Sequence, residues 1–184
     1  MVQSVVLFAH IVGVLSLFVA LGLEWITLDA IRRAATRDEG VRWVRLHATL
    51  PRAAGIAVAI IVVSGFFLGA RFGVLGDGWM RASYAAMVVM AIIGGPISRP
   101  RLRALRQAAA DAGDRNGGTL RAAASDFILS LSLRLRGLLG LAVVYLMVRK
   151  PEPLEAIVVL AATALIGAAV GVSKTSSIAI AART

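Results

Sequence analysis

The chain has 184 residues, of which 59% are hydrophobic and 16% are charged, and its mean hydropathy is +0.83. This composition excludes an ordinary soluble globular domain and indicates an integral membrane protein. The formal net charge is +10, and the chain has no cysteine, which excludes disulfides, cysteine-ligated zinc, iron–sulfur clusters and thiol nucleophiles.

Five apolar stretches are long enough to cross a bilayer as helices, for which about 20 mostly apolar residues are needed because lipid cannot satisfy backbone amides. They are residues 5–25, 53–70, 80–98, 128–148 and 155–173. We therefore predict an all-α, polytopic membrane protein in which residues 1–184 form one five-helix bundle with amphipathic cytoplasmic extensions. No basic residue precedes the first stretch and no small-residue cleavage site closes it, so we expect a retained helix and not a signal peptide.

Basic residues gather in alternate connections between these stretches. Six arginines lie in the first connection and six in the third, and two basic residues follow the last stretch, whereas the second and fourth connections hold two each. The positive-inside rule then places the N-terminus outside and the C-terminus in the cytoplasm of a bacterial inner membrane. We expect the arginines to contact anionic headgroups of the lipid bilayer, and no motif points to nucleic acid.

The first connection is predicted to be helical. Asp29 lies at helical spacing from two arginines, so the first helix is expected to continue past the membrane until Gly40 ends it. The segment 41–51 predicts an interfacial helix with Val41 and Val44 on one face, before Pro51 opens the second span.

The third connection predicts an amphipathic helix ended by Gly113, a flexible linker over 114–118, and Thr119 as the N-cap of a helix that continues into the fourth span. The run LSLSLRLR in that span alternates with period two, but a lone strand cannot satisfy its backbone in lipid, so a helix is expected. Arg134 and Arg136 then lie inside its cytoplasmic end, where they either reach lipid headgroups or line a cavity that binds an anion.

His10 is an ionisable residue inside the first span. It shares one helical face with Gln3 and Glu24, and that face is expected to look into the bundle. Burying a histidine is unfavourable unless it has a partner. Three roles are open: a packed histidine bonded to a hydroxyl or carbonyl, a ligand of haem iron or a metal ion, and a member of a proton or solute pathway.

The second histidine, His47, lies at the cytoplasmic entrance of the second span, on the order of 20 Å from His10, so one ion is not expected to join both. Met87 is expected to be level with His10, and a His/Met pair suits haem or copper. The side chains predicted to line a cavity in the outer half of the bundle are Gln3, Ser64, Tyr84, Met90, Tyr145 and Thr163.

No catalytic constellation is present in the sequence. Glu24 closes the first apolar stretch and the other acidic residues lie in loops or at helix ends, so no carboxylate relay is expected inside the spans. P-loop, zincin and nucleophile-elbow patterns are absent, which disfavours an enzyme.

Small residues recur at helical spacing. Ala9, Gly13, Ser16 and Ala20 form a stripe on the first span, and GFFLG and GAAVG are GxxxG spacings. We expect close helix contacts, either within the chain or in a homo-oligomer.

The segments LFAHIVG, SGFFLGARFG and YLMVRKPEP, together with the arginine-rich first loop, resemble a bacterial family of small integral-membrane proteins of uncharacterised function over most of the chain. The histidine of the first helix is also similar to that of the haem-carrying, membrane-bound protoporphyrinogen oxidase family and of copper-resistance membrane proteins. The oxidase resemblance implies that His10 ligates haem b. The lysine that this family uses in a later helix has no counterpart here, because Lys150 and Lys174 lie at helix ends.

The sequence therefore predicts a small membrane protein that binds haem or a metal ion through His10. The alternatives are an oligomeric transporter or channel for a small solute or ion, and a membrane scaffold that uses its basic loops.

Overall fold

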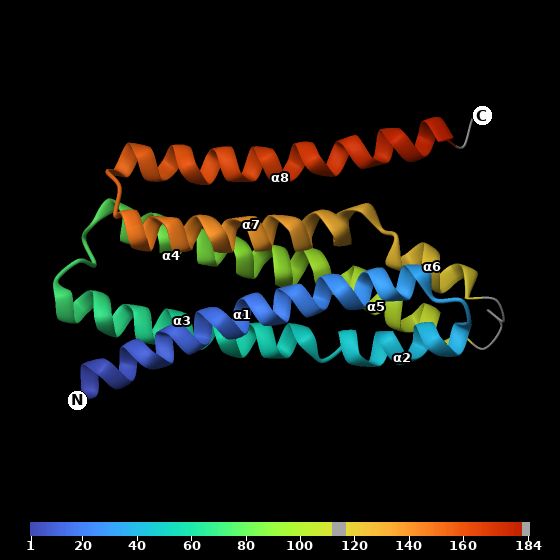
Figure 1. The fold of residues 1–184 in the computed structure, drawn as a ribbon, viewed down its shortest axis with the longest axis horizontal. Coiled ribbons are helices and arrows are strands. Elements are labelled where there is room, and N and C mark those ends of the chain that lie inside the picture. The colour runs from blue at the N-terminus through green and yellow to red at the C-terminus, as the bar shows by residue number, and fades with distance from the viewer. Residues whose placement is uncertain (112–116, 182–184) are drawn as a thin grey trace.

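A computed structural model describes residues 1–111 and 117–181 of the chain, with side chains as far as residue 169. As predicted, it is all-α: the described residues contain no strand. Five long helices run along one axis (Figure 1), namely α1 (Val2–Arg33), α3 (Leu50–Phe72), α4 (Gly78–Ile92), α7 (Phe127–Arg149) and α8 (Pro153–Ala181). The short helices α2 (Arg37–His47), α5 (Ser98–Ala110) and α6 (Gly118–Ala124) gather at one end, and the π-helix η1 (Ile93–Ile97) joins α4 to α5.

Four helical stretches are long and apolar enough to cross a membrane: Val2–Arg33, Arg37–Phe72, Gly78–Ala110 and Gly118–Arg149. The described part of the last helix, Pro153–Ala169, is apolar but shorter, so the fifth span stays a prediction. Large apolar side chains point outward, such as Phe8 with 68% and Val63 with 70% of its surface exposed. An apolar exterior of this kind suits contact with lipid rather than water.

The first helix ends earlier than the sequence analysis expected. α1 stops at Arg33, and Thr36 caps α2 by accepting a hydrogen bond from the backbone N of Glu39, while the Glu39 carboxylate accepts one from the backbone N of Ala35. This arrangement is a capping box, which starts a new helix by satisfying its free amides. The prediction that Gly40 ends the first helix is wrong: Gly40 lies inside α2, packed against Leu120.

The third connection also breaks where a single helix was expected. Gly117, with a φ of 67°, is the N-cap of α6 in place of Thr119, and α6 ends at Ala124. The Asp126 side chain then accepts a 2.7 Å hydrogen bond from the backbone N of Leu129 and starts α7. The period-two run is helical, as predicted. Gly113 and residues 114–116 of the predicted linker lie outside the described residues, while Gly118 belongs to α6.

The third span contains a π-helix that the sequence analysis did not foresee. Pro96 has no N–H to donate, so the regular α-helical bonding pattern cannot continue through it. The Ser98 hydroxyl lies 2.7 Å from the carbonyl oxygen of Ile93, five residues earlier, and 2.9 Å from the Ser132 hydroxyl of α7. The wider turn is thus anchored to the neighbouring helix. π-turns of this kind frequently mark functional sites.

Arginines bind the short helices together by donating to backbone carbonyls at the ends of neighbouring helices. Arg32 donates to the carbonyl of Ala124 at 2.8 Å, and Arg121 donates to that of Ala34 at 3.2 Å. Arg37 and Arg106 likewise donate to the carbonyls of Ala109 and Ala48, at 2.9 and 3.1 Å. Cationic groups at helix C-termini satisfy free carbonyls and complement the helix dipole. Several arginines of the basic connections therefore hold the fold together in addition to setting its charge.

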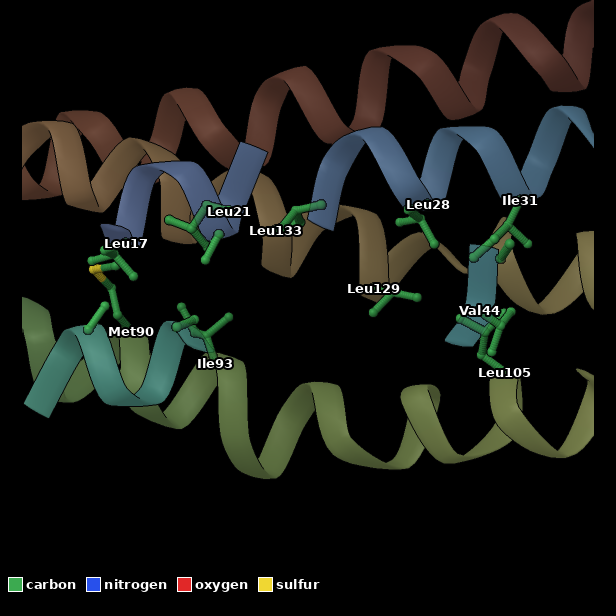
Figure 2. Close-up of a cluster of buried hydrophobic side chains, with 14 of the residues drawn as sticks. Leu17, Leu21, Leu28, Ile31, Val44, Met90, Ile93, Leu105, Leu129 and Leu133 are labelled. Atoms are coloured by element: carbon green, nitrogen blue, oxygen red, sulfur yellow. The ribbon is translucent and has the colours of Figure 1, made fainter. Parts of the chain in front are cut away.

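One apolar core connects the long helices with the short ones. Figure 2 shows Leu17 of α1 beside Met90 of α4 at one end of this core, and Ile31, Val44 and Leu105 together at the other. Gly13 of the predicted stripe and Gly167 of GAAVG pack within the chain, whereas Ser16 of the stripe is exposed. A Cβ on Gly13 would lie 3.0–3.1 Å from two isoleucines of α3, and one on Gly167 would lie 2.7 Å from a leucine of α7. The homo-oligomer stays a prediction.

Candidate functional site

A buried ion pair joins α1 to α7. Nη2 of Arg136 lies 2.5 Å from Oε2 of Glu24, and only 10% and 3% of the two side chains are exposed. The expectation that the spans hold no carboxylate is therefore wrong. Glu24 lies on the buried face of α1 with Leu17, Leu28 and Ile31, and these helical spacings were the signal for its burial in the sequence.

The pair is incompletely satisfied within the described part of the chain. Oε1 of Glu24 and Nε of Arg136 are both buried and have no hydrogen-bond partner there. Buried polar atoms of charged groups are normally bonded, because leaving one unpaired forfeits its hydration without replacement. Nε of Arg136 is therefore a buried donor that has no partner in the described chain.

Arg136 lines a cavity of about 340 Å³, hereafter the Arg136 cavity, between α1, α3, α4, η1, α5 and α7. A second arginine, Arg99, lies in its wall and is exposed. The π-helix shapes this space: a Cβ on Gly94 would lie 3.3 Å from Arg136, so the glycine lets the guanidinium pass close to the η1 backbone. The other lining residues are Leu17, Leu21, Pro51, Ala54, Gly55, Val58, Met90, Ala91, Gly95 and Leu102.

His47 lies close to the ion pair and is buried, although the sequence analysis expected its segment to be an interfacial helix. Only 3% of it is exposed, and its Nδ1 lies 2.8 Å from the Thr27 hydroxyl oxygen. The Thr27 hydroxyl donates to the carbonyl of Leu23 at 2.7 Å, so Nδ1 of His47 is the donor in their contact. The positive charges of Arg106 and Arg136 act on the ring.

His10 forms a separate polar site in the other half of the bundle. It is 9% exposed, and its Nδ1 lies 3.0 Å from the Ser64 hydroxyl oxygen on α3. The Ser64 hydroxyl donates to the carbonyl of Ile60, so Nδ1 of His10 carries the proton and Nε2 keeps its lone pair. Thr27 lies 17 residues further along α1, or about 25 Å, so His10 and His47 cannot hold one ion, as predicted.

The side chains predicted around His10 are brought together only in part. A Cβ on Gly65 would lie 3.2 Å from the His10 ring and 3.8 Å from the Tyr84 hydroxyl, which is buried without a hydrogen-bond partner in the described chain. Tyr84 and Met87 line a small space of about 10 Å³ that Gly65 also borders. No cluster of three His, Cys, Asp or Glu side chains able to hold a metal ion occurs among the described residues.

The remaining residues of the predicted outer cavity lie apart from His10. Met90 lines the Arg136 cavity instead. Gln3 is exposed in the first turn of α1, and Thr163 is half-buried and donates to the carbonyl of Val159. The Tyr145 hydroxyl donates to the Glu155 carboxylate at 3.3 Å on the surface. Arg134 is half-buried, with its guanidinium 5.5 Å from the centre of the Trp25 ring.

Fold and sites together describe an all-α chain with helices able to span a membrane and a charged, partly buried cavity near its arginine-rich end. No protein-family model matches the chain, and neither a curated protein nor a solved structure matches it.

Proposed function

We propose that this protein is a five-span bacterial inner-membrane protein, N-terminus outside, that binds a small organic anion in the Arg136 cavity. The observation that carries the proposal is the buried Nε of Arg136, which lies in a cavity-lining side chain and has no partner in the described chain. The short helices and the arginine-rich connections lie at the same end of the bundle, which supports the orientation by the positive-inside rule.

The chemistry of the walls defines the ligand class. Two guanidinium groups, those of Arg136 and Arg99, line the cavity, and guanidinium donors match carboxylate and phosphate oxygens. Glu24, which is paired with Arg136, is not itself among the lining residues, so no carboxylate lies in the walls. Leu17, Val58 and other apolar residues form most of the remaining wall. A volume of about 340 Å³ lies within the usual range for small-molecule sites. The ligand expected is an anion with an apolar body.

A series of six-carbon probes tests this proposal on the purified protein in detergent. Hexanoate, hexanol and hexylamine have the same chain and differ in the charge of the head, so only hexanoate should bind saturably and raise the unfolding temperature. Arg99→Gln should weaken hexanoate binding by several-fold, as expected for an exposed charge. Equal effects of hexanoate and hexanol would contradict an anion site.

A second pair of variants separates loss of the site from loss of the fold. A Cβ at Gly55 meets no atom within 4 Å, so Gly55→Leu should fill the Arg136 cavity without disturbing α3. It should abolish hexanoate binding at unchanged helix content. Gly22→Leu has equally open surroundings but lies outside this cavity, and it should bind hexanoate normally. Hexanoate binding that survives Gly55→Leu would place the ligand elsewhere. Flux of a bound anion into proteoliposomes would identify a transporter.

Haem or metal binding through His10 is the second candidate, and the tautomer of His10 favours it. Because Nδ1 of His10 donates to the Ser64 hydroxyl, Nε2 keeps the lone pair that a metal ligand needs. Histidines that bind a metal through one ring nitrogen typically donate a hydrogen bond from the other. The 10 Å³ beside Tyr84 and Met87 cannot hold a porphyrin. A larger space is the apolar groove of about 510 Å³ between α1 and α3, and Ser64, the hydrogen-bond partner of His10, borders that groove.

An absorption spectrum tests this second candidate. Protein purified after haem-replete expression should show a Soret band that is lost in His10→Ala and retained in His47→Ala. For a metal ion in place of haem, copper bound to the wild type and lost in both His10→Ala and Met87→Leu would support the His/Met pair. Colourless, metal-free protein would leave His10 as a packed polar residue bonded to Ser64.

A further inference from the structure

A second surface feature, independent of the Arg136 cavity, combines apolar walls with positive charge. It is a groove of about 620 Å³, hereafter the α8 groove, with walls from α1, α7 and α8. Its lining residues are Phe18, Leu21, Gly22, Trp25, Leu133, Arg134, Gly137, Leu138, Leu141, Ile166 and Gly167. Figure 1 shows α8 running alongside α7 on the outside of the bundle. Leu141 and Ile166 are more than half exposed, so the groove opens to the surroundings of the protein.

Three glycines line the groove, and two of them, Gly22 and Gly137, have open space where a side chain would lie. A Cβ at Gly22 of α1 or at Gly137 of α7 would meet no atom within 4 Å. In close-packed helix pairs a glycine lets two backbones approach, but these two glycines face open space instead. Their missing side chains widen the groove beside α1 and α7, and a flexible hydrocarbon chain fits such a groove.

Positive charge lies at one point of the same groove. Arg134 lines the groove with its guanidinium 5.5 Å from the Trp25 ring centre. Tryptophan with arginine is typical of the headgroup level of a membrane, where each arginine favours an anionic surface by about fivefold.

We propose that the α8 groove is a binding site for an anionic phospholipid, with one acyl chain between α1 and α8 and the phosphate beside Arg134. A phospholipid fits better than a helix of a second copy, because the walls place charge at one point of an otherwise apolar groove. The site is distinct from the Arg136 cavity: apart from Leu21, the two share no lining residue.

Quenching of Trp25 by brominated lipids tests the proposal. Trp43→Phe and Trp79→Phe leave Trp25 as the only tryptophan, and this protein is reconstituted in phosphatidylcholine containing a minor fraction of dibrominated phosphatidylglycerol or dibrominated phosphatidylcholine. Brominated phosphatidylglycerol should quench Trp25 more strongly at equal mole fraction. Arg134→Gln should reduce that preference by about fivefold.

Filling the groove provides the matched control. Gly137→Leu should remove the preference for brominated phosphatidylglycerol, while Gly55→Leu, which fills the Arg136 cavity, should leave it intact. Far-UV circular dichroism confirms that both variants are folded. Equal quenching by the two brominated lipids, or a preference unchanged in Gly137→Leu, would overturn the lipid site. Neither result bears on hexanoate binding in the Arg136 cavity.

Discussion

Removing one partner of the Glu24–Arg136 pair should destabilise the protein much more than removing both. At 2.5 Å and an effective dielectric constant of about 20, the attraction between the two charges is about 7 kcal/mol. Desolvation opposes it by several kcal/mol for each buried ion, so the intact pair contributes little net stability. Arg136→Met leaves the Glu24 carboxylate buried and unpaired, which should lower the free energy of unfolding by about 3–5 kcal/mol.

The double variant Glu24→Leu/Arg136→Met should recover most of that loss, because apolar side chains of similar size replace both charges. The measurement is unfolding by sodium dodecyl sulfate in mixed micelles, followed by tryptophan fluorescence. Glu24→Gln supplies a milder single change for the case in which Arg136→Met does not fold. It keeps an acceptor for the guanidinium and should have an effect of about 1–3 kcal/mol.

An exposed ion pair on the same helix is the control. Arg33 and Asp29 lie 2.9 Å apart, and their side chains are 79% and 40% exposed. Arg33→Met should therefore change the free energy of unfolding by less than about 1 kcal/mol. If Arg136→Met proves as mild as Arg33→Met, Arg136 is not buried against Glu24 in the membrane. If the double variant is as unstable as the single ones, the shape of the side chains matters and their charge does not.

Three further substitutions should change the same unfolding free energy. Gly13→Leu forces a side chain into the contact between α1 and α3 and should destabilise the protein by about 1–3 kcal/mol. Its control is Gly22→Ala, whose added Cβ meets no neighbouring atom and which should be neutral or slightly stabilising. Equal effects of the two substitutions would refute the close packing at Gly13. Thr27→Val removes the hydroxyl that faces Nδ1 of His47 and should cost about 1–3 kcal/mol, and an unchanged value would mean that water replaces it. Thr36→Ala removes the N-cap of α2 and should cost about 0.5–2 kcal/mol, an effect that Thr36→Ser should largely avoid.

The positions of the long helices were predictable because the signal is local. Length and hydropathy place the predicted segments 5–25, 53–70, 80–98 and 128–148 within helical stretches that can span a membrane. The same logic identified LSLSLRLR as helical, since backbone satisfaction in lipid overrides a two-residue alternation. Hydropathy averages over many residues, so single substitutions do not disturb it.

The helix ends between the spans were mispredicted, although their signals are also local. The sequence from Thr36 to Glu39 is a capping box, and Asp126 stands before the apolar run of α7. The expectation that Gly40 and Thr119 mark these boundaries relied on residue types that are common at helix ends. Capping bonds to backbone amides decided the boundaries instead.

The partners of the polar side chains were beyond the reach of the sequence. Glu24 and Arg136 are 112 residues apart, and Arg32 reaches a carbonyl 92 residues away. Nothing local specifies which faces of α1 and α7 meet, because rotating either helix about its axis leaves its hydropathy unchanged. The fit of many side chains at once selects one rotation, and that rotation decides whether an arginine reaches lipid or a buried carboxylate.

By itself, the sequence determined that this chain is helical, apolar on its outside and strongly basic in alternate connections, because hydropathy and charge are sums over its residues. It also singled out His10 and Arg136 as ionisable groups in apolar surroundings. Only the tertiary structure decided that Ser64 fixes the His10 ring, that Glu24 lies against Arg136, and that a cavity opens beside Arg136. Those features depend on the relative rotation and separation of helices, which long-range packing sets.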